Sequence, residues 1–167
     1  MYPASCIVFT DWWVQMQNDL IFIPQHWDLR YDHAAGETGT RFFKAIMERK
    51  EIIGKKCPKC KRVLLPPRSL CERCFVETAE WIKVGSEGTI QAFTIVYEKF
   101  EGLPDPPYAI AYVLLDGANT AMANFVKGID LSDIKRALKH IKIGAKVQVA
   151  FRKKRQGRIT DFWYELK

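Results

Sequence analysis

Hydrophobic and polar positions alternate with a period of two along much of residues 80–167, which predicts a set of β-strands. The clearest case is residues 88–99, where one face would carry Ile90 and Val96 and the other Phe93 and Tyr97. A short strand is predicted at 80–84, and the other main strands are predicted at 108–115, 120–126, 145–153 and 159–166. Residues 116–119, Asp-Gly-Ala-Asn, are typical of a hairpin turn.

One predicted helix interrupts the strands, because residues 132–141 repeat apolar positions at helical spacing. Asp130 or Ser132 is expected to cap its N-terminus. Its inward face is expected to consist of three apolar residues, Ile134, Leu138 and Ile141. Five main strands with one helix between the third and the fourth are typical of an OB-fold barrel.

The N-terminal part, residues 1–52, is expected to be helical or irregular. Thr38-Gly39-Thr40 is predicted to cap a helix over about Arg41–Glu51. Its apolar face would consist of Phe42, Phe43, Ile46 and Met47. We interpret this face as packing on the rest of the protein, with docking of a partner or covering of a ligand as the alternative. Three tryptophans among the first thirty residues suggest docking onto an unidentified target: Trp12, Trp13 and Trp27.

Two Cys-x-x-Cys pairs lie in residues 53–79, separated by ten residues: Cys57, Cys60, Cys71 and Cys74. Each pair can form a tight turn, or knuckle, whose backbone amides point at the thiolates, and two facing knuckles give a tetrahedral four-sulfur site. This segment has few apolar side chains, so the metal would supply most of its stability. We interpret the motif as a structural zinc site, because four thiolates leave no open coordination position; iron is the alternative ion.

Nothing else in the sequence predicts catalytic chemistry. The fifth cysteine, Cys6, is interpreted as a free thiol, since no motif places a histidine beside it. Paired carboxylates, a nucleophile–base motif and a phosphate loop do not occur in the sequence. No catalytic residues are therefore predicted, and no activity is expected of the chain in isolation.

Composition adds limits on the class of protein. The chain has 167 residues, 48% of them hydrophobic, which is enough for a core and excludes disorder as a description of the whole. No apolar run approaches the roughly 18–20 residues of a membrane span. A signal peptide would begin with basic residues, but none precedes Arg30. A cytoplasmic protein without a membrane segment is expected. In a reducing compartment, paired cysteines favour a metal over disulfides.

The net charge of +7 is concentrated at the C-terminal end. Residues 127–167 contain 12 basic and 4 acidic side chains, whereas residues 1–126 are almost neutral. An anionic partner is therefore expected for the last quarter of the chain. A zinc ion on four thiolates would lower the net charge to about +5.

Several short segments between residues 38 and 167 occur together in one known family. The most specific is Pro66-Pro67-Arg68 between the cysteine pairs, because zinc ribbons in general do not require it. The others lie at 41–43, 53–60, 63–65, 71–74, 88–90, 93–94, 106–108 and 143–147. Through these segments the sequence resembles the zinc-ribbon plus OB-fold acyl-CoA-associated proteins, formerly a domain of unknown function. It departs at Lys61, where the family usually has glycine.

The resemblance implies a mainly β fold with α-helices in three parts. These are an N-terminal helical segment at 1–52, a rubredoxin-like zinc ribbon at 53–79 and a C-terminal OB-fold barrel at 80–167. It also implies a non-catalytic accessory subunit that associates with a thiolase or thiolase-like condensing enzyme and helps to form or bridge its acyl-CoA site. Zinc would be the structural cofactor, and coenzyme A or an acyl-CoA the ligand.

An acyl-CoA site needs basic groups for the phosphates and an apolar slot for the pantetheine arm. The basic groups are predicted to be Arg152, Lys153, Lys154 and Arg155, together with Arg158. The apolar slot is predicted in the proline-rich loop, at Phe100, Leu103, Pro104 and Tyr108. Prolines stiffen this loop and lower the cost of ordering it on binding. The alternatives are a solvated hairpin for the basic run and a rigid connector or protein-docking element for the loop.

A second hypothesis is binding of single-stranded nucleic acid, because zinc ribbons and OB-folds both occur in such proteins. Phe93, Tyr97 and Tyr112 would then stack on bases. Their strands are nearly neutral, however, and the basic cluster lies elsewhere in the sequence. We therefore favour the acyl-CoA hypothesis over this one.

Overall fold

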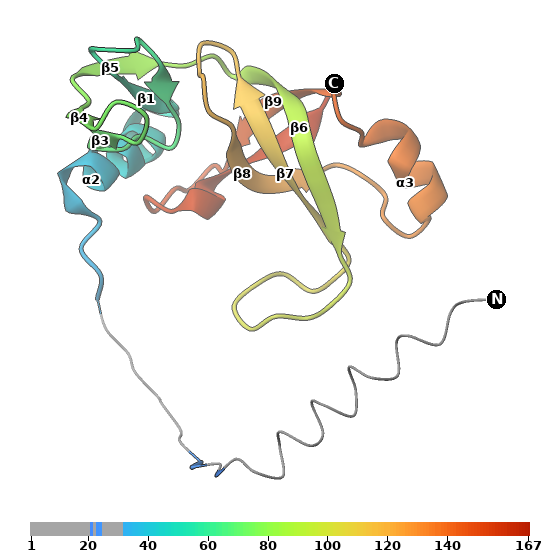
Figure 1. The fold of residues 1–167 in the computed structure, drawn as a ribbon. Helices are drawn as coiled ribbons and strands as arrows, with labels where there is room; N and C mark the ends of the chain where they lie inside the picture. Colours follow the sequence, from blue (N-terminus) through green and yellow to red (C-terminus); the bar gives the residue numbers. More distant parts are fainter. Residues whose placement is uncertain (1–20, 22, 25–31) are drawn as a thin grey trace, which may run out of the picture. The chain divides into compact units, whose positions relative to one another are not determined.

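The structure is a computed structural model, and it describes residues 21, 23–24 and 32–167 (Figure 1). Cys6 and the three N-terminal tryptophans lie outside the described residues. Residues 34–167 form one compact unit, and the fold of that unit follows. Among the described residues no helix is long and apolar enough to cross a membrane.

The N-terminal helix α2 (Gly36–Lys44) continues into a π-helical turn, η2 (Ala45–Arg49). The helix begins earlier than predicted, so Thr38 and Thr40 lie inside it and the predicted cap is wrong. The chain enters the helix through Gly36, whose φ of 67° suits a glycine, and no side chain caps the N-terminus. The predicted apolar face is confirmed, because Phe42 and Ile46 are buried in the main core.

The ribbon contains a three-stranded antiparallel sheet, in the order β2-β1-β5. Its strands are β1 (Ile53–Lys56), β2 (Val63–Leu64) and β5 (Glu80–Lys83). A separate two-stranded sheet pairs β3 (Leu70–Cys71) with β4 (Val76–Glu77). The sequence assigned the strand at 80–84 to the barrel part, but β5 pairs along its whole length with β1. The guanidinium of Arg41 and the ammonium of Lys55 lie 4.8 and 5.3 Å from the Trp81 ring centre and fix this strand against α2.

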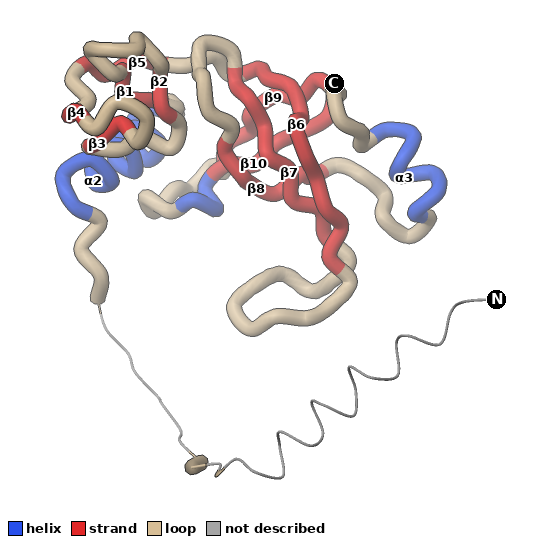
Figure 2. Tube along the Cα trace, viewed as in Figure 1, coloured by secondary structure: helices blue, strands red, loops and turns tan. Residues whose placement is uncertain are grey.

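The C-terminal part is a closed five-stranded barrel, in the order β10-β8-β7-β6-β9 (Figure 2). Its strands are β6 (Glu87–Val96), β7 (Tyr108–Leu115), β8 (Met122–Lys127), β9 (Lys146–Phe151) and β10 (Phe162–Leu166). All neighbours are antiparallel except β8 and β10, which are parallel. This topology confirms the predicted OB-fold. The last strand starts three residues later than predicted, because residues 159–161 form a 3-10 turn, η3.

The helix between the third and fourth barrel strands, α3 (Ile134–His140), differs from the prediction in its cap and its buried face. Its N-cap is Asp133, whose carboxylate accepts from the backbone N–H groups of Lys135 and Arg136 at 2.9 and 3.2 Å. Asp130 instead accepts from Ser132 one turn earlier. Ala137 and Ile141 are buried, but Ile134 and Leu138 are exposed, so the expected inward face is wrong for those two residues.

The ribbon and the barrel share one hydrophobic core and are joined by hydrogen bonds. The Val63 N–H donates to Oδ1 of Asn119 at 2.9 Å, and the Asn119 N–H donates back to the Val63 carbonyl at 2.9 Å. The hydroxyl of Thr120 both accepts from the Leu65 N–H and donates to the Leu65 carbonyl. The turn between β7 and β8 therefore holds strand β2 of the ribbon in place.

Candidate metal centre and ligand cleft

The four cysteine sulfurs come together in the ribbon, all within 4.8 Å of one another. Cys57 and Cys71 are buried, whereas Cys60 and Cys74 are partly exposed. A tetrahedral zinc ion with Zn–S bonds of about 2.3 Å requires sulfurs about 3.8 Å apart. The Sγ atoms of Cys60 and Cys71 lie 3.8 Å apart, so the sulfurs fit a structural zinc ion.

Both knuckles close with the same backbone turn. The Lys61 N–H donates to the Cys57 carbonyl at 3.0 Å, and the Phe75 N–H donates to the Cys71 carbonyl at 2.9 Å. Lys61 and Phe75 have φ values of 63° and 52°, in the left-handed region that favours glycine. Lys61 therefore keeps the knuckle geometry, although it occupies a position where glycine is usual in the family it resembles.

The electrostatics of the cluster differ between its sulfurs. The backbone N–H of Cys60 lowers the pKa of the Cys57 thiol to about 6, with further donation from its neighbours. Burial raises the pKa of the Cys74 thiol to about 12, together with the adjacent sulfurs. A divalent cation bound to all four sulfurs would displace the remaining protons and compensate the clustered negative charge.

A second feature is an open cleft of about 400 Å³ on the barrel. Loop 97–107, between β6 and β7, contributes Leu103 and Pro104 to its wall. Three cations also line it, namely Lys127 at the end of β8 and Arg152 and Arg158 from loop 152–158 between β9 and β10. The remaining lining residues are Gly102, Phe125, Thr160 and Phe162. An apolar slot therefore lies beside positive charges, and no acidic residue is among the lining residues.

The two loops that border the cleft are internally braced. The ammonium of Lys99 and the carboxylate of Asp105 form an ion pair of 2.7 Å across loop 97–107. In the other loop, the Asp161 carboxylate accepts from the backbone N–H groups of Gln156 and Arg158 at 2.7 and 3.0 Å. Burial acts to raise the pKa of Asp161, but these backbone donors outweigh it and hold that pKa below its usual value. The Asp161 carboxylate therefore holds the backbone of loop 152–158 at Gln156 and Arg158.

The structure brings some of the predicted ligand residues together and leaves others apart. The predicted residues that line the cleft are Leu103, Pro104, Arg152 and Arg158. Tyr108 is buried behind it, edge to face with Phe125 at a ring distance of 5.6 Å. Three others are exposed and are not lining residues: Phe100, Lys153 and Lys154.

Arg155 has a different role from the predicted one. Its guanidinium donates to the carbonyl of Met47 at 2.8 Å and to the carbonyls of Arg152 and Lys153 at 3.0 Å each.

Three residues that line the cleft were not predicted from the sequence: Lys127, Phe125 and Phe162. They lie on strands whose periodicity indicates pairing but not which end borders a loop.

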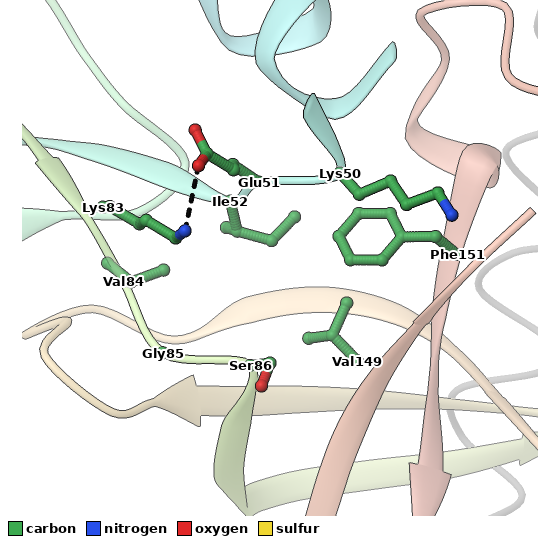
Figure 3. A pocket seen from close by; sticks show the side chains of 9 residues that line it. All are labelled: Lys50, Glu51, Ile52, Lys83, Val84, Gly85, Ser86, Val149 and Phe151. Atoms are coloured by element: carbon green, nitrogen blue, oxygen red, sulfur yellow. Dashed lines mark hydrogen bonds and ion pairs between the residues drawn. The ribbon is translucent and has the colours of Figure 1, made fainter. Parts of the chain in front are cut away.

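A smaller pocket of about 300 Å³ lies where the ribbon meets the barrel (Figure 3). Its apolar walls come from Ile52, Val84, Val149 and Phe151. At its rim, the ammonium of Lys83 is paired with Glu51 at 2.9 Å, a contact that also lowers the pKa of Glu51. Most of the lining is apolar or already paired, so we interpret the pocket as a gap in the packing between the ribbon and the barrel.

The three residues proposed to stack on bases, Phe93, Tyr97 and Tyr112, are not part of the basic lining of the ligand cleft. Tyr97 and Tyr112 are exposed, and Phe93 is half-buried. The cross-strand neighbours of Tyr112 are Ala92 and Ala123, neither of which is charged.

Comparisons with known proteins agree with both halves of the fold. Residues 48–79 match the family model described as the ChsH2 rubredoxin-like zinc ribbon domain, and residues 81–152 match the ChsH2 C-terminal OB-fold domain. A DUF35 domain-containing scaffold protein of Methanocaldococcus jannaschii is 32% identical over 80 residues, 46% of this chain. The match spans 55% of that relative, little more than half its length. Another of the same name, from Methanothermobacter thermautotrophicus, is 27% identical over 70% of this chain and 83% of its own.

Two solved structures share the fold. A DUF35-family protein of unknown function from Sulfolobus solfataricus has a TM-score of 0.59 and 24% identity, over 95% of this chain and 98% of its own. The Ltp2-ChsH2(DUF35) aldolase contains a chain with a TM-score of 0.58 and 17% identity, over 81% of this chain and 97% of that one. At these identities the two structures support the architecture alone.

Proposed function

Because the chain belongs to the ChsH2-type (DUF35) family of zinc-ribbon and OB-fold proteins, we propose that it is a scaffold subunit of a thiolase-like enzyme and carries part of its acyl-CoA site. The ribbon would be a zinc-dependent structural element. The barrel would present the ligand cleft to the active site of the partner. The chain itself would not catalyse a reaction.

The cleft is the observation that carries this proposal. Its cations, Lys127, Arg152 and Arg158, suit the phosphates of coenzyme A. Its apolar side, with Leu103 and Pro104, suits the pantetheine arm. A volume of about 400 Å³ lies within the usual range for small-molecule sites, about 300–1,000 Å³.

The accessory role is supported by what relatives are named. Two are named scaffold proteins, and a chain of similar fold occurs in the Ltp2-ChsH2(DUF35) aldolase. The metal centre agrees with such a role, since four thiolates would leave zinc without an open position for substrate.

Recovery of the native complex tests the scaffold role. The tagged full-length chain is purified from its own organism, and the partners are identified by mass spectrometry. We expect stoichiometric recovery of one thiolase-like condensing enzyme. Recovery of nucleic-acid enzymes in its place would contradict the proposal.

One observation favours a second candidate function. The cleft lies between the loops that follow the first and fourth strands of the barrel, which OB-folds use to bind oligonucleotides as well as other ligands. Binding of single-stranded nucleic acid at Phe125, Lys127 and Arg152 is therefore the alternative. It predicts tight binding of an oligonucleotide that weakens steeply with added salt.

A further inference from the structure

Helix α3 exposes apolar side chains that its sequence pattern would have buried. Ile134 and Leu138, one turn apart, are 37% and 46% exposed, and Ile143 just beyond the helix is 69% exposed. The helix contacts the barrel through the small side chain of Ala137 and through Ile141, both buried. Larger apolar groups gathered at an exposed site are typical of an interaction surface.

Positive charge surrounds these apolar side chains. Residues 134–146 contain five basic residues and no acidic residue. Within the described part of the chain, Lys135, Lys139 and Lys142 form no ion pair. We define the α3 surface as Ile134, Leu138 and Ile143 with Lys135, Lys139 and Lys142.

A groove of about 360 Å³ runs along the other side of the helix. Arg136 and His140 line it from α3, and Ile129, Leu166 and Lys167 line it from the barrel. Its one acidic lining residue is Asp130. The groove would accept an anchoring side chain. Its two cations are Arg136 and Lys167, and Lys167 is already paired with Glu87.

The α3 surface is separate from the site proposed for the ligand. It shares no residue with the lining of the ligand cleft, and α3 projects from the side of the barrel away from the ribbon (Figure 1). The two sites can therefore be tested with separate substitutions.

We infer that the α3 surface docks the thiolase-like partner through a patch with an apolar centre and a rim of aspartates and glutamates. This inference rests on the proposed function and names the surface that the scaffold would use. Charge complementarity selects the partner, because unpaired lysines surrounding apolar side chains match such a patch. An anionic membrane surface is the other possible occupant, and the test below includes it as an outcome that would overturn the inference.

The test measures the affinity of the full-length, zinc-loaded chain for the purified condensing enzyme recovered with it. Two variants alter the α3 surface, Lys135→Glu/Lys139→Glu and Leu138→Ser. The matched control, Lys44→Glu/Lys154→Glu, changes the net charge equally at exposed positions of α2 and of the loop between β9 and β10. Zinc content and circular dichroism establish that each variant is folded.

We expect each α3 variant to weaken binding at least tenfold, while the control binds as the wild type does. Unchanged affinity in both α3 variants would overturn the inference and leave the proposed function standing. Failure of the wild-type chain to bind the condensing enzyme would overturn both. A parallel assay uses phosphatidylglycerol–phosphatidylcholine vesicles. Loss of vesicle binding in the α3 variants without loss of enzyme binding would also overturn it.

Discussion

The Nε–H of Arg155 donates to the backbone carbonyl of Met47 across 2.8 Å, which ties the loop between β9 and β10 to the end of the N-terminal helix. Gly157 lies against the same helix, where an added Cβ would be 3.8 Å from the sulfur of Met47. The loop that supplies Arg152 and Arg158 to the cleft is therefore positioned from a segment more than a hundred residues earlier.

Replacing Arg155 should destabilise the protein. Arg155→Ala removes a guanidinium that satisfies three carbonyls, so we expect a loss of about 1–2 kcal/mol in the free energy of unfolding. Urea titration measures it. The neighbouring exposed Lys154→Ala is the control and should change the value by less than about 0.5 kcal/mol. Equal effects of the two substitutions would show that the contact with Met47 contributes nothing.

Asp161 should make the free energy of unfolding depend on pH in the acidic range. Its pKa is lowered in the folded state, so its contribution is complete above the unfolded pKa, about 3.9, and is lost as pH falls through the lower folded value. Asp161→Asn should be less stable by about 1–3 kcal/mol at pH 7, because backbone donors lose a charged acceptor. The difference between the two proteins should shrink below about pH 4. Comparing them at each pH cancels any shared effect of zinc loss, and a constant difference would contradict the assignment.

Zinc should be required for folding of the ribbon and should also stabilise the barrel. The metal ligands form a small buried cluster of their own, but Ile53 and Val63 of the ribbon strands belong to the same core as the barrel. Removal of the metal by a chelator should therefore lower the thermal midpoint of the whole unit. Cys60→Ser should reduce zinc below one equivalent per chain, measured by atomic emission. Cys6→Ser is the matched control and should retain full zinc. Full occupancy in Cys60→Ser would contradict the four-sulfur site.

The left-handed backbone at Lys61 predicts a stabilising substitution. Lys61→Gly should raise the free energy of unfolding by up to about 1 kcal/mol, because glycine adopts a φ of 63° without strain. Lys59→Gly, two residues earlier and not in the left-handed region, should destabilise the protein by increasing the entropy of the unfolded chain. Stabilisation by both glycines would mean that backbone strain is not the cause. The same argument applies to Phe75, which is 80% exposed.

The sequence predicted the barrel and the metal centre because each rests on local patterns. The alternation over β7 and the spacing of the cysteines are found in the structure as predicted. In β6 a bulge between Ile90 and Ala92 shifts the register, so Phe93 packs against the same core as Ile90 and the predicted division of its faces is wrong. Predictions that needed the tertiary arrangement were less reliable. The strand at 80–84 could not be assigned from its own pattern, since its pairing with β1 is a choice between two sheet edges.

Ile134 and Leu138 show why periodicity alone misjudged a buried face. The periodicity of α3 identified a helix, but the side chains buried there are those of Ala137 and Ile141. Arg155 and Arg158 were indistinguishable as members of a basic loop. Only the contact of Arg155 with Met47 separates the structural residue from the one at the cleft.

The cleft is proposed to contribute an acyl-CoA site to the assembled enzyme. The most direct measurement is calorimetric titration of coenzyme A into the purified complex carrying Lys127→Gln/Arg152→Gln, compared with wild type and with the control Lys153→Gln/Lys154→Gln. We expect at least a tenfold loss of affinity in the cleft variant and little change in the control, because the cleft cations line the cavity and the control lysines do not. Identical affinities in all three complexes would contradict the account.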